Sequence, residues 1–177
     1  MPAAALFRIE KSPMTRTLII GYGNIDRADD GVAYEVINAL RRRRGQEMLD
    51  EENTGLEALG AEVDSIFLSQ LTPELMELLC GYDRVVFVDA HVYEGIDDLH
   101  CATVSPEYAP ASLTHHLTPG MLLAMIKAVY RREPVGHLVS IRGYDFGFHR
   151  NLSAGTRALV GQAVDYLLQW LNGHGHR

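Results

Sequence analysis

Residues 18–31 read Leu-Ile-Ile-Gly-Tyr-Gly-Asn-Ile-Asp-Arg-Ala-Asp-Asp-Gly, an apolar run that ends in two glycines and an asparagine before two adjacent carboxylates. The apolar run predicts a buried strand at 17–20, and the apolar periodicity that follows predicts a helix at 31–42. A strand followed so closely by a helix is typical of an open α/β sheet, which binds ligands at the carboxyl ends of its strands. Asp29 and Asp30 are therefore expected in a crevice at the sheet edge.

The same stretch partly matches the dinucleotide-binding pattern G-x-G-x-x-G. Gly21 and Gly23 fit the pattern, but Asp26 stands where the third glycine is required. Three carboxylates around a helix N-terminus would repel a phosphate, whereas they suit a cation or a water held for acid–base chemistry. The hypothesis of a nucleotide-binding oxidoreductase domain is therefore supported by only two glycines. Helix capping by Asp29 or Asp30 explains one carboxylate of the pair but not both.

The composition is that of a globular protein rather than a nucleic-acid or membrane protein. The formal net charge of −7 argues against a nucleic-acid partner, since no basic face is evident. The basic run 41–44 ends the first expected helix, where a solvated cluster complements the helix dipole. No apolar stretch approaches the ~20 residues that span a bilayer, so no membrane insertion is expected. Cys80 and Cys101 lack zinc-ligand spacing and favour reduced thiols in a cytoplasmic protein.

Strand and helix patterns alternate along one domain. Residues 1–16 are expected to be a flexible leader, 17–172 a single α/β domain and 173–177 a disordered tail. Further strands are expected at 62–67, 84–88, 101–104 and 138–142, and further helices at 73–79, 119–130 and 153–171. Thr72 and Ser153 are the expected caps of two of these helices. The alternation predicts a three-layer α/β fold, with a mostly parallel twisted sheet of about five strands, a weak edge strand at 101–104 and helices on both faces.

Polar residues fall where such a sheet places its functional groups. Asp30 follows the first strand, Asp89 ends the third, and His115 and His116 lie in the loop before a helix. Asp89 directly follows Val-Val-Phe-Val, where an ionised group is costly unless it is paired or binds a metal, although an aspartate there also serves as a cap or loop brace. A loop imidazole is commonly solvated. Asp145, in the last loop, is a further candidate.

Two carboxylates and an imidazole suit a borderline divalent ion such as Ni²⁺ or Zn²⁺. Three protein ligands leave a position open for water or substrate. The sequence contains neither a Gly-x-Ser-x-Gly elbow nor an HExxH zinc motif. A serine or cysteine nucleophile is therefore disfavoured.

These motifs, in this order, resemble those of the nickel–iron hydrogenase maturation proteases over residues 17–172. The matching segments are Gly21-Tyr-Gly23-Asn24, Asp29-Asp30-Gly31, Val88-Asp89-Ala90, Thr114-His115-His116-Leu117, and Leu138-Val-Ser-Ile-Arg142 followed by Asn151-Leu152-Ser153. The resemblance implies an endopeptidase that removes the C-terminal extension of the hydrogenase large subunit after nickel insertion. The large-subunit precursor is then the partner, and a monomer is favoured.

The resemblance also implies which residues form the site. The family's metal triad corresponds to Asp30, Asp89 and His115, which would be both catalytic residues and metal ligands for a nickel ion supplied by the substrate. With Asp30 as a ligand, Asp29 is the expected helix cap. His115 is preferred to His116 because it keeps the spacing to the following helix. Gln70 stands in the segment where the family has an Asp-Gly-Gly-type turn, and it cannot carry a charge. This departure keeps open a second hypothesis, a non-cleaving maturation chaperone or nickel-sensing protein for a metalloenzyme precursor.

Overall fold

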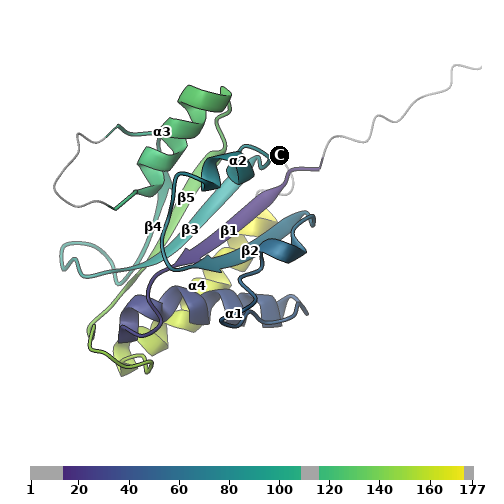
Figure 1. Ribbon diagram of the computed structural model, residues 1–177. Helices are drawn as coiled ribbons and strands as arrows, with labels where there is room; N and C mark the ends of the chain where they lie inside the picture. Colours follow the sequence, from purple (N-terminus) through teal and green to yellow (C-terminus); the bar gives the residue numbers. More distant parts are fainter. Residues whose placement is uncertain (1–13, 109–115, 174–177) are drawn as a thin grey trace, which may run out of the picture.

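A five-stranded sheet with strand order β2-β1-β3-β5-β4 forms the centre of the protein (Figure 1). The computed structural model describes residues 14–108 and 116–173. The strands are β1 (Thr17–Tyr22), β2 (Val63–Leu68), β3 (Arg84–His91), β4 (Leu99–Val104) and β5 (Val135–Arg142). All neighbours pair in parallel except β4, which runs antiparallel to β5 at one edge. The expected mostly parallel α/β fold is confirmed.

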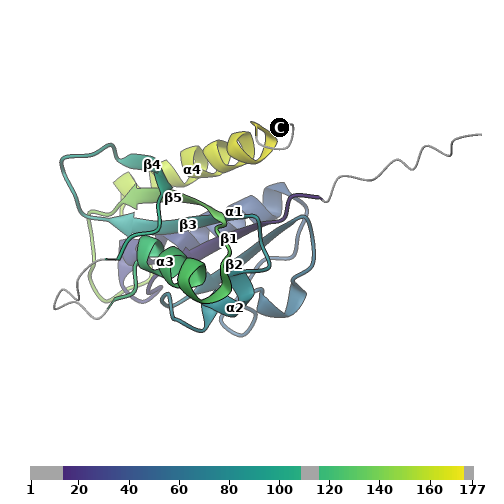
Figure 2. The same ribbon diagram turned by 90° about the horizontal axis from the view of Figure 1, so that it is seen from above.

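Helices cover both faces of the sheet, as Figure 2 shows from above. The longer helices α1 (Val32–Arg43) and α4 (Ala154–Gly173) pack together on one face. The other face carries α2 (Leu75–Leu79) and α3 (Pro119–Tyr130). Two short 3₁₀ turns, η1 (Ala28–Gly31) and η2 (Leu56–Ala58), complete the elements. The result is the expected three-layer arrangement.

The central strands are apolar on both sides because both sides are covered. In β1, Leu18 and Ile20 belong to the core under α2 and α3, whereas Ile19 belongs to the core under α1 and α4, and none of the three is exposed. Burying each such side chain contributes about 1.5–3 kcal/mol. This alternation also fixes the face of the residue that follows, so Tyr22 lies on the same side of the sheet as Ile20.

The order of the strands creates a switch point between β1 and β3. From β1 the chain crosses over α1 to β2 on one side, and from β2 it crosses over α2 to β3 on the other side of β1. Connections that leave in opposite directions open a crevice at the carboxyl ends of the two strands, where doubly wound proteins bind ligands. Tyr22 and Asp89 lie at this point, at or near the ends of β1 and β3.

Several elements differ from their expected bounds, and β4 and β5 begin earlier than expected, at Leu99 and Val135. Strand β3 continues to His91 instead of ending at Val88, because Asp89 pairs in register with Ser140 of β5 and so belongs to the sheet. Helix α2 begins at Leu75, and Thr72 does not cap it. The Thr72 side chain instead hydrogen-bonds the Glu74 carboxylate and keeps the pKa of that carboxyl below its ordinary value.

Other expectations agree with the structure or fall outside it. Ser153 caps α4 by accepting a hydrogen bond of 3.3 Å from the backbone N–H of Thr156. The expected leader (1–16) and tail (173–177) lie mostly outside the described residues. Within 14–108 and 116–173, none of the helices has the length and apolarity that crossing a membrane requires.

Candidate functional site

A pocket of about 570 Å³ opens at the carboxyl end of β1. It is formed by the loop after β1, the loop after β2, the segment before α3 and the loop after β5. Its lining residues are Tyr22, Gly23, Asn24, Arg27, Asp30, Ser69, Gln70, Leu71, His116, Leu117 and Phe146. Two of the residues singled out from the sequence, Asp30 and His116, therefore line one cavity, and Gln70 forms part of its wall.

The loop after β1 aims Asp30 at this pocket. The backbone N–H of Asn24 donates a hydrogen bond of 2.9 Å to Oδ2 of Asp30, which turns the carboxylate back toward the end of the strand. Gly23 makes this turn possible: its φ is 147°, and a Cβ there would lie 2.0 Å from the backbone oxygen of Asp30. Only glycine fits such a close approach. Gly23, the second glycine of the apparent nucleotide motif, thus allows Asp30 to approach the end of β1, and its role in this loop needs no bound phosphate.

Asp89 is not among the residues that line this pocket, and two hydroxyl groups next to it hold its carboxylate. The Tyr22 hydroxyl donates to Oδ2 over 2.7 Å, and the Ser140 hydroxyl donates to Oδ1 over 2.6 Å. Ser140 also contacts Nδ1 of His91 at 3.1 Å, so the network spans β1, β3 and β5. Both oxygens of Asp89 are therefore fixed in orientation.

The charge on Asp89 is disfavoured by its surroundings. Burial raises the pKa of this carboxyl, and the nearby Asp30 carboxylate raises it further. The hydrogen bonds from Ser140 and Tyr22 act in the opposite direction but do not restore the ordinary value. Burial also raises the pKa of the Tyr22 phenol, so Tyr22 remains a donor to Asp89. A cation at this position would relieve the repulsion between Asp30 and Asp89.

Three residues not predicted from the sequence interact with Asp89, namely Tyr22, Ser140 and His100. His100 of β4 is opposite Ser140 in the sheet and lowers the pKa of Asp89 through its charge. Period-two alternation in the strands places Tyr22 on the face of Ile20, but no pattern in the sequence indicates that β5 pairs with β3. The contact of Ser140 with Asp89 could therefore be recognised only from the register in which β5 pairs with β3.

The two loop histidines have different outcomes. His115 lies outside the described residues, whereas His116 is exposed and lines the pocket. The role of His115 as a metal contact, and its preference over His116, therefore stay predictions. Asp145 does not line the pocket: its carboxylate accepts a 2.9 Å hydrogen bond from the N–H of Gly147 and pairs with His149 at 3.0 Å.

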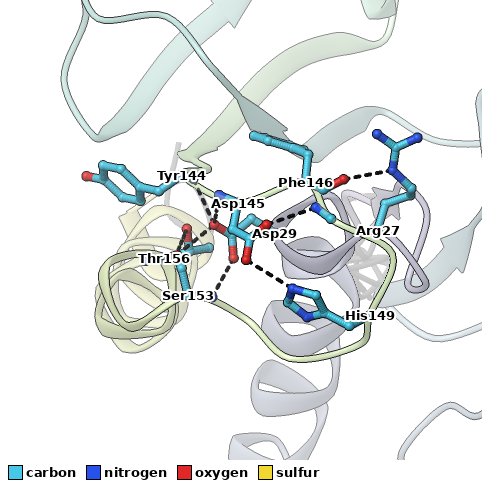
Figure 3. Close-up of polar contacts among 9 residues, drawn as sticks. Arg27, Asp29, Tyr144, Asp145, Phe146, His149, Ser153 and Thr156 are labelled. Atoms are coloured by element: carbon cyan, nitrogen blue, oxygen red, sulfur yellow. Dashed lines mark hydrogen bonds and ion pairs between the residues drawn. The ribbon is translucent and has the colours of Figure 1, made fainter.

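Asp29 does not cap its own helix, contrary to expectation, and instead anchors the loop after β5 (Figure 3). Its side chain is fully buried. It accepts hydrogen bonds from the N–H groups of Tyr144 (2.8 Å), Asp145 (2.9 Å) and Ser153 (2.7 Å), and from the Ser153 hydroxyl (2.7 Å). This loop carries Phe146, which forms one wall of the pocket. The two adjacent aspartates therefore have separate structural settings.

The donors at the crevice suit a divalent ion. Among the described residues, no cluster of three or more His, Cys, Asp or Glu side chains is close enough to hold a metal. Asp30 and His116 supply a carboxylate and an imidazole to the pocket, and Asp89, outside its lining, is near enough to Asp30 for their charges to repel. Oxygen and nitrogen donors of this kind are chemically suited to a borderline divalent ion.

The strand order defines a doubly wound α/β protein with a pocket at the carboxyl end of β1, next to the switch point between β1 and β3. No protein-family model matches the sequence, and no curated protein sequence is significantly similar to it. Solved structures do match it. The hydrogenase maturating endopeptidase HybD from Escherichia coli matches with a TM-score of 0.65 and 19% identity, over 91% of this chain and 94% of that chain.

Two archaeal structures give the same result. The NiFe hydrogenase maturation protease HycI from Thermococcus kodakarensis has a TM-score of 0.61 and 20% identity, over 91% of this chain and 95% of its own. A hydrogenase 2 maturation peptidase from a Thaumarchaeota archaeon has a TM-score of 0.59 and 22% identity, over 89% and 99%. The chain therefore has the fold of the nickel–iron hydrogenase maturation proteases along about nine-tenths of its length.

Proposed function

We propose that this protein is an endopeptidase that removes the C-terminal extension of a nickel-loaded NiFe-hydrogenase large-subunit precursor in the cytoplasm. The observation that carries the proposal is a pocket at the carboxyl end of β1 that is lined by Asp30 and His116, with the buried carboxyl of Asp89 near enough to Asp30 for their charges to repel. The shared fold of solved hydrogenase maturation proteases supports it. Nickel, in this proposal, is part of the substrate.

Asp30, Asp89 and His115 are the proposed contacts to that nickel and the proposed catalytic residues. Asp30 is partly exposed at the pocket, so it can contact the ion and the polypeptide around it. Asp89 is outside the pocket lining, and the Tyr22 and Ser140 hydroxyls hold its oxygens in one orientation. A divalent ion beside a peptide bond polarises its carbonyl or acidifies a bound water. A carboxylate at the same place accepts the proton of the attacking water.

Substitution of the proposed contacts tests their roles. Asp30→Asn and Asp89→Asn keep the size of each side chain and remove its charge, so both are expected to abolish cleavage while the protein remains folded. His115→Gln is expected to do the same, and His116→Gln to retain activity. Cleavage by either aspartate variant at the wild-type rate, measured by intact-mass spectrometry of the precursor, would remove that residue from the mechanism.

A second candidate is a maturation chaperone or nickel sensor that binds the precursor without cutting it. The observation that favours it is the engagement of both Asp89 oxygens by hydroxyl groups, together with the uncharged Gln70 in the pocket wall. Size-exclusion chromatography separates the two functions. A stable complex between the wild-type protein and a nickel-loaded precursor of unchanged mass supports the chaperone, whereas shortened precursor supports the protease.

A further inference from the structure

A second groove, of about 950 Å³, continues from the candidate site around the carboxyl end of β2. The two hollows share four lining residues, Gly23, Asn24, Ser69 and Gln70. Beyond them, the groove runs along β2, which is an edge strand, between the loop that precedes this strand and helix α2. A chain lying in the groove would therefore lead directly into the candidate site.

Part of the groove's lining is apolar. Phe67 lies edge-on to Tyr34, with 5.2 Å between the ring centroids, and both line the groove. Leu56, which is 41% exposed, and the side chains of Leu75 and Leu78 add aliphatic surface. Apolar surface next to a reactive pocket favours burial of apolar side chains from a ligand.

The groove is also acidic. Four carboxylates and no lysine or arginine are among its lining residues, the acids being Asp26, Asp50, Glu51 and Glu74. Arg150 compensates part of this charge from outside the lining, since it pairs with Asp26 at 2.6 Å and also with Glu51. No ion pair to Asp50 or Glu74 is found among the described residues. The groove thus keeps a net negative charge.

We propose that this groove binds the segment of the client polypeptide next to the bond that is cut, as an extended chain with alternating apolar and basic side chains. In an extended chain successive side chains point in opposite directions, so such a chain presents apolar and basic side chains together to a groove whose lining is both apolar and acidic. Opposite charge steers such a segment into place and selects against acidic ones. This inference rests on the proposed function and adds the chemistry of its substrate.

Fluorescence anisotropy tests the groove without any cleavage. The probes are a fluorescein-labelled decapeptide of alternating valine and lysine and a matched peptide with glutamate for lysine. The double variant Glu51→Gln/Glu74→Gln is expected to bind the lysine peptide about tenfold more weakly, since each exposed charge is worth roughly a two- to fivefold change. Leu56→Gln is expected to weaken it as well. Glu133→Gln/Asp165→Asn removes two paired, exposed acids outside the groove and is the matched control.

The proposal predicts that the wild type and the control bind the lysine peptide with equal affinity. The glutamate peptide is expected to bind at least about tenfold more weakly. Raising the salt concentration from about 0.05 M to about 0.5 M is expected to weaken binding of the lysine peptide. Equal binding of the two peptides, or an equal loss in the control, would overturn it. If the proposed function fails but the groove proposal holds, the protein binds the lysine peptide and leaves the precursor uncut. With a cleaved client, glutamates placed beside the cut are expected to raise KM and leave kcat unchanged.

Discussion

Replacing Asp29 by asparagine tests how much the anchored loop depends on one buried charge. The carboxylate is fully buried, and its two oxygens accept four hydrogen bonds from the loop after β5. Asparagine keeps one acceptor and turns an NH₂ group toward backbone N–H donors. Buried donors left without a partner cost about 1–3 kcal/mol each. We expect Asp29→Asn to lower the free energy of unfolding by about 3 kcal/mol at pH 7.

The pH dependence of stability gives an independent magnitude. Burial alone would raise the pKa of Asp29, but the hydrogen bonds from Tyr144, Ser153 and Asp145 outweigh it and hold the pKa at about 2, against 3.8 ordinarily. This difference corresponds to about 2 kcal/mol of stability. Because the folded-state pKa is the lower one, the contribution is complete above the unfolded-state pKa and disappears as the pH falls. About 1 kcal/mol of it is lost by pH 3.

Urea unfolding followed by circular dichroism measures both quantities. The difference in unfolding free energy between wild type and Asp29→Asn is expected to shrink by about 1 kcal/mol between pH 7 and pH 3. Asp165→Asn, which removes an exposed acid of α4, is the control and is expected to stay within about 0.5 kcal/mol of wild type. A stability of Asp29→Asn close to that of the control, or a difference independent of pH, would refute the anchoring role.

Three further changes have distinct expected outcomes. Tyr22→Phe removes a donor to Asp89, so the pKa of Asp89 is expected to rise further in a ¹³C NMR titration, and an unchanged or lower pKa contradicts this. Gly23→Ala places a Cβ 2.0 Å from the Asp30 backbone oxygen, so urea unfolding should show a free energy of unfolding about 3 kcal/mol lower. Wild-type stability of this variant would disprove the close approach. Arg150→Ala breaks two exposed ion pairs and should cost less than about 1 kcal/mol, with a larger loss in thermal melting indicating a structural role.

The sequence predicted the layers of the fold better than the ends of its elements. Apolar runs at β1 and β3 and the helical periodicity of α1 and α3 are strong local signals, and their order already implies a parallel sheet. The extension of β3 to His91 depends on pairing with β5, which is a long-range contact.

The candidate site was predictable where chemistry follows directly from a strand end. Asp30 was expected at the sheet edge in this way and does line the pocket, whereas Asp89 lies within β3, outside the lining, and its role in the site stays a prediction. The role of Asp29 was not predictable, since its partners come from more than one hundred residues further along the chain. For the same reason Arg41, expected to be solvated with its neighbours, is instead buried and donates to the backbone oxygen of Ser65. The roles of such polar residues are therefore determined by tertiary contacts, which local sequence patterns do not reveal.

The mass of a hydrogenase large-subunit precursor, measured before and after incubation with the wild-type protein, tests the central claim most directly. The account predicts that the nickel-loaded precursor loses a C-terminal fragment and that the nickel-free precursor keeps its full mass. The Asp30→Asn variant should leave both precursors intact. A nickel-loaded precursor that keeps its full mass in the presence of folded wild-type protein would contradict the assignment of this crevice as a protease active site.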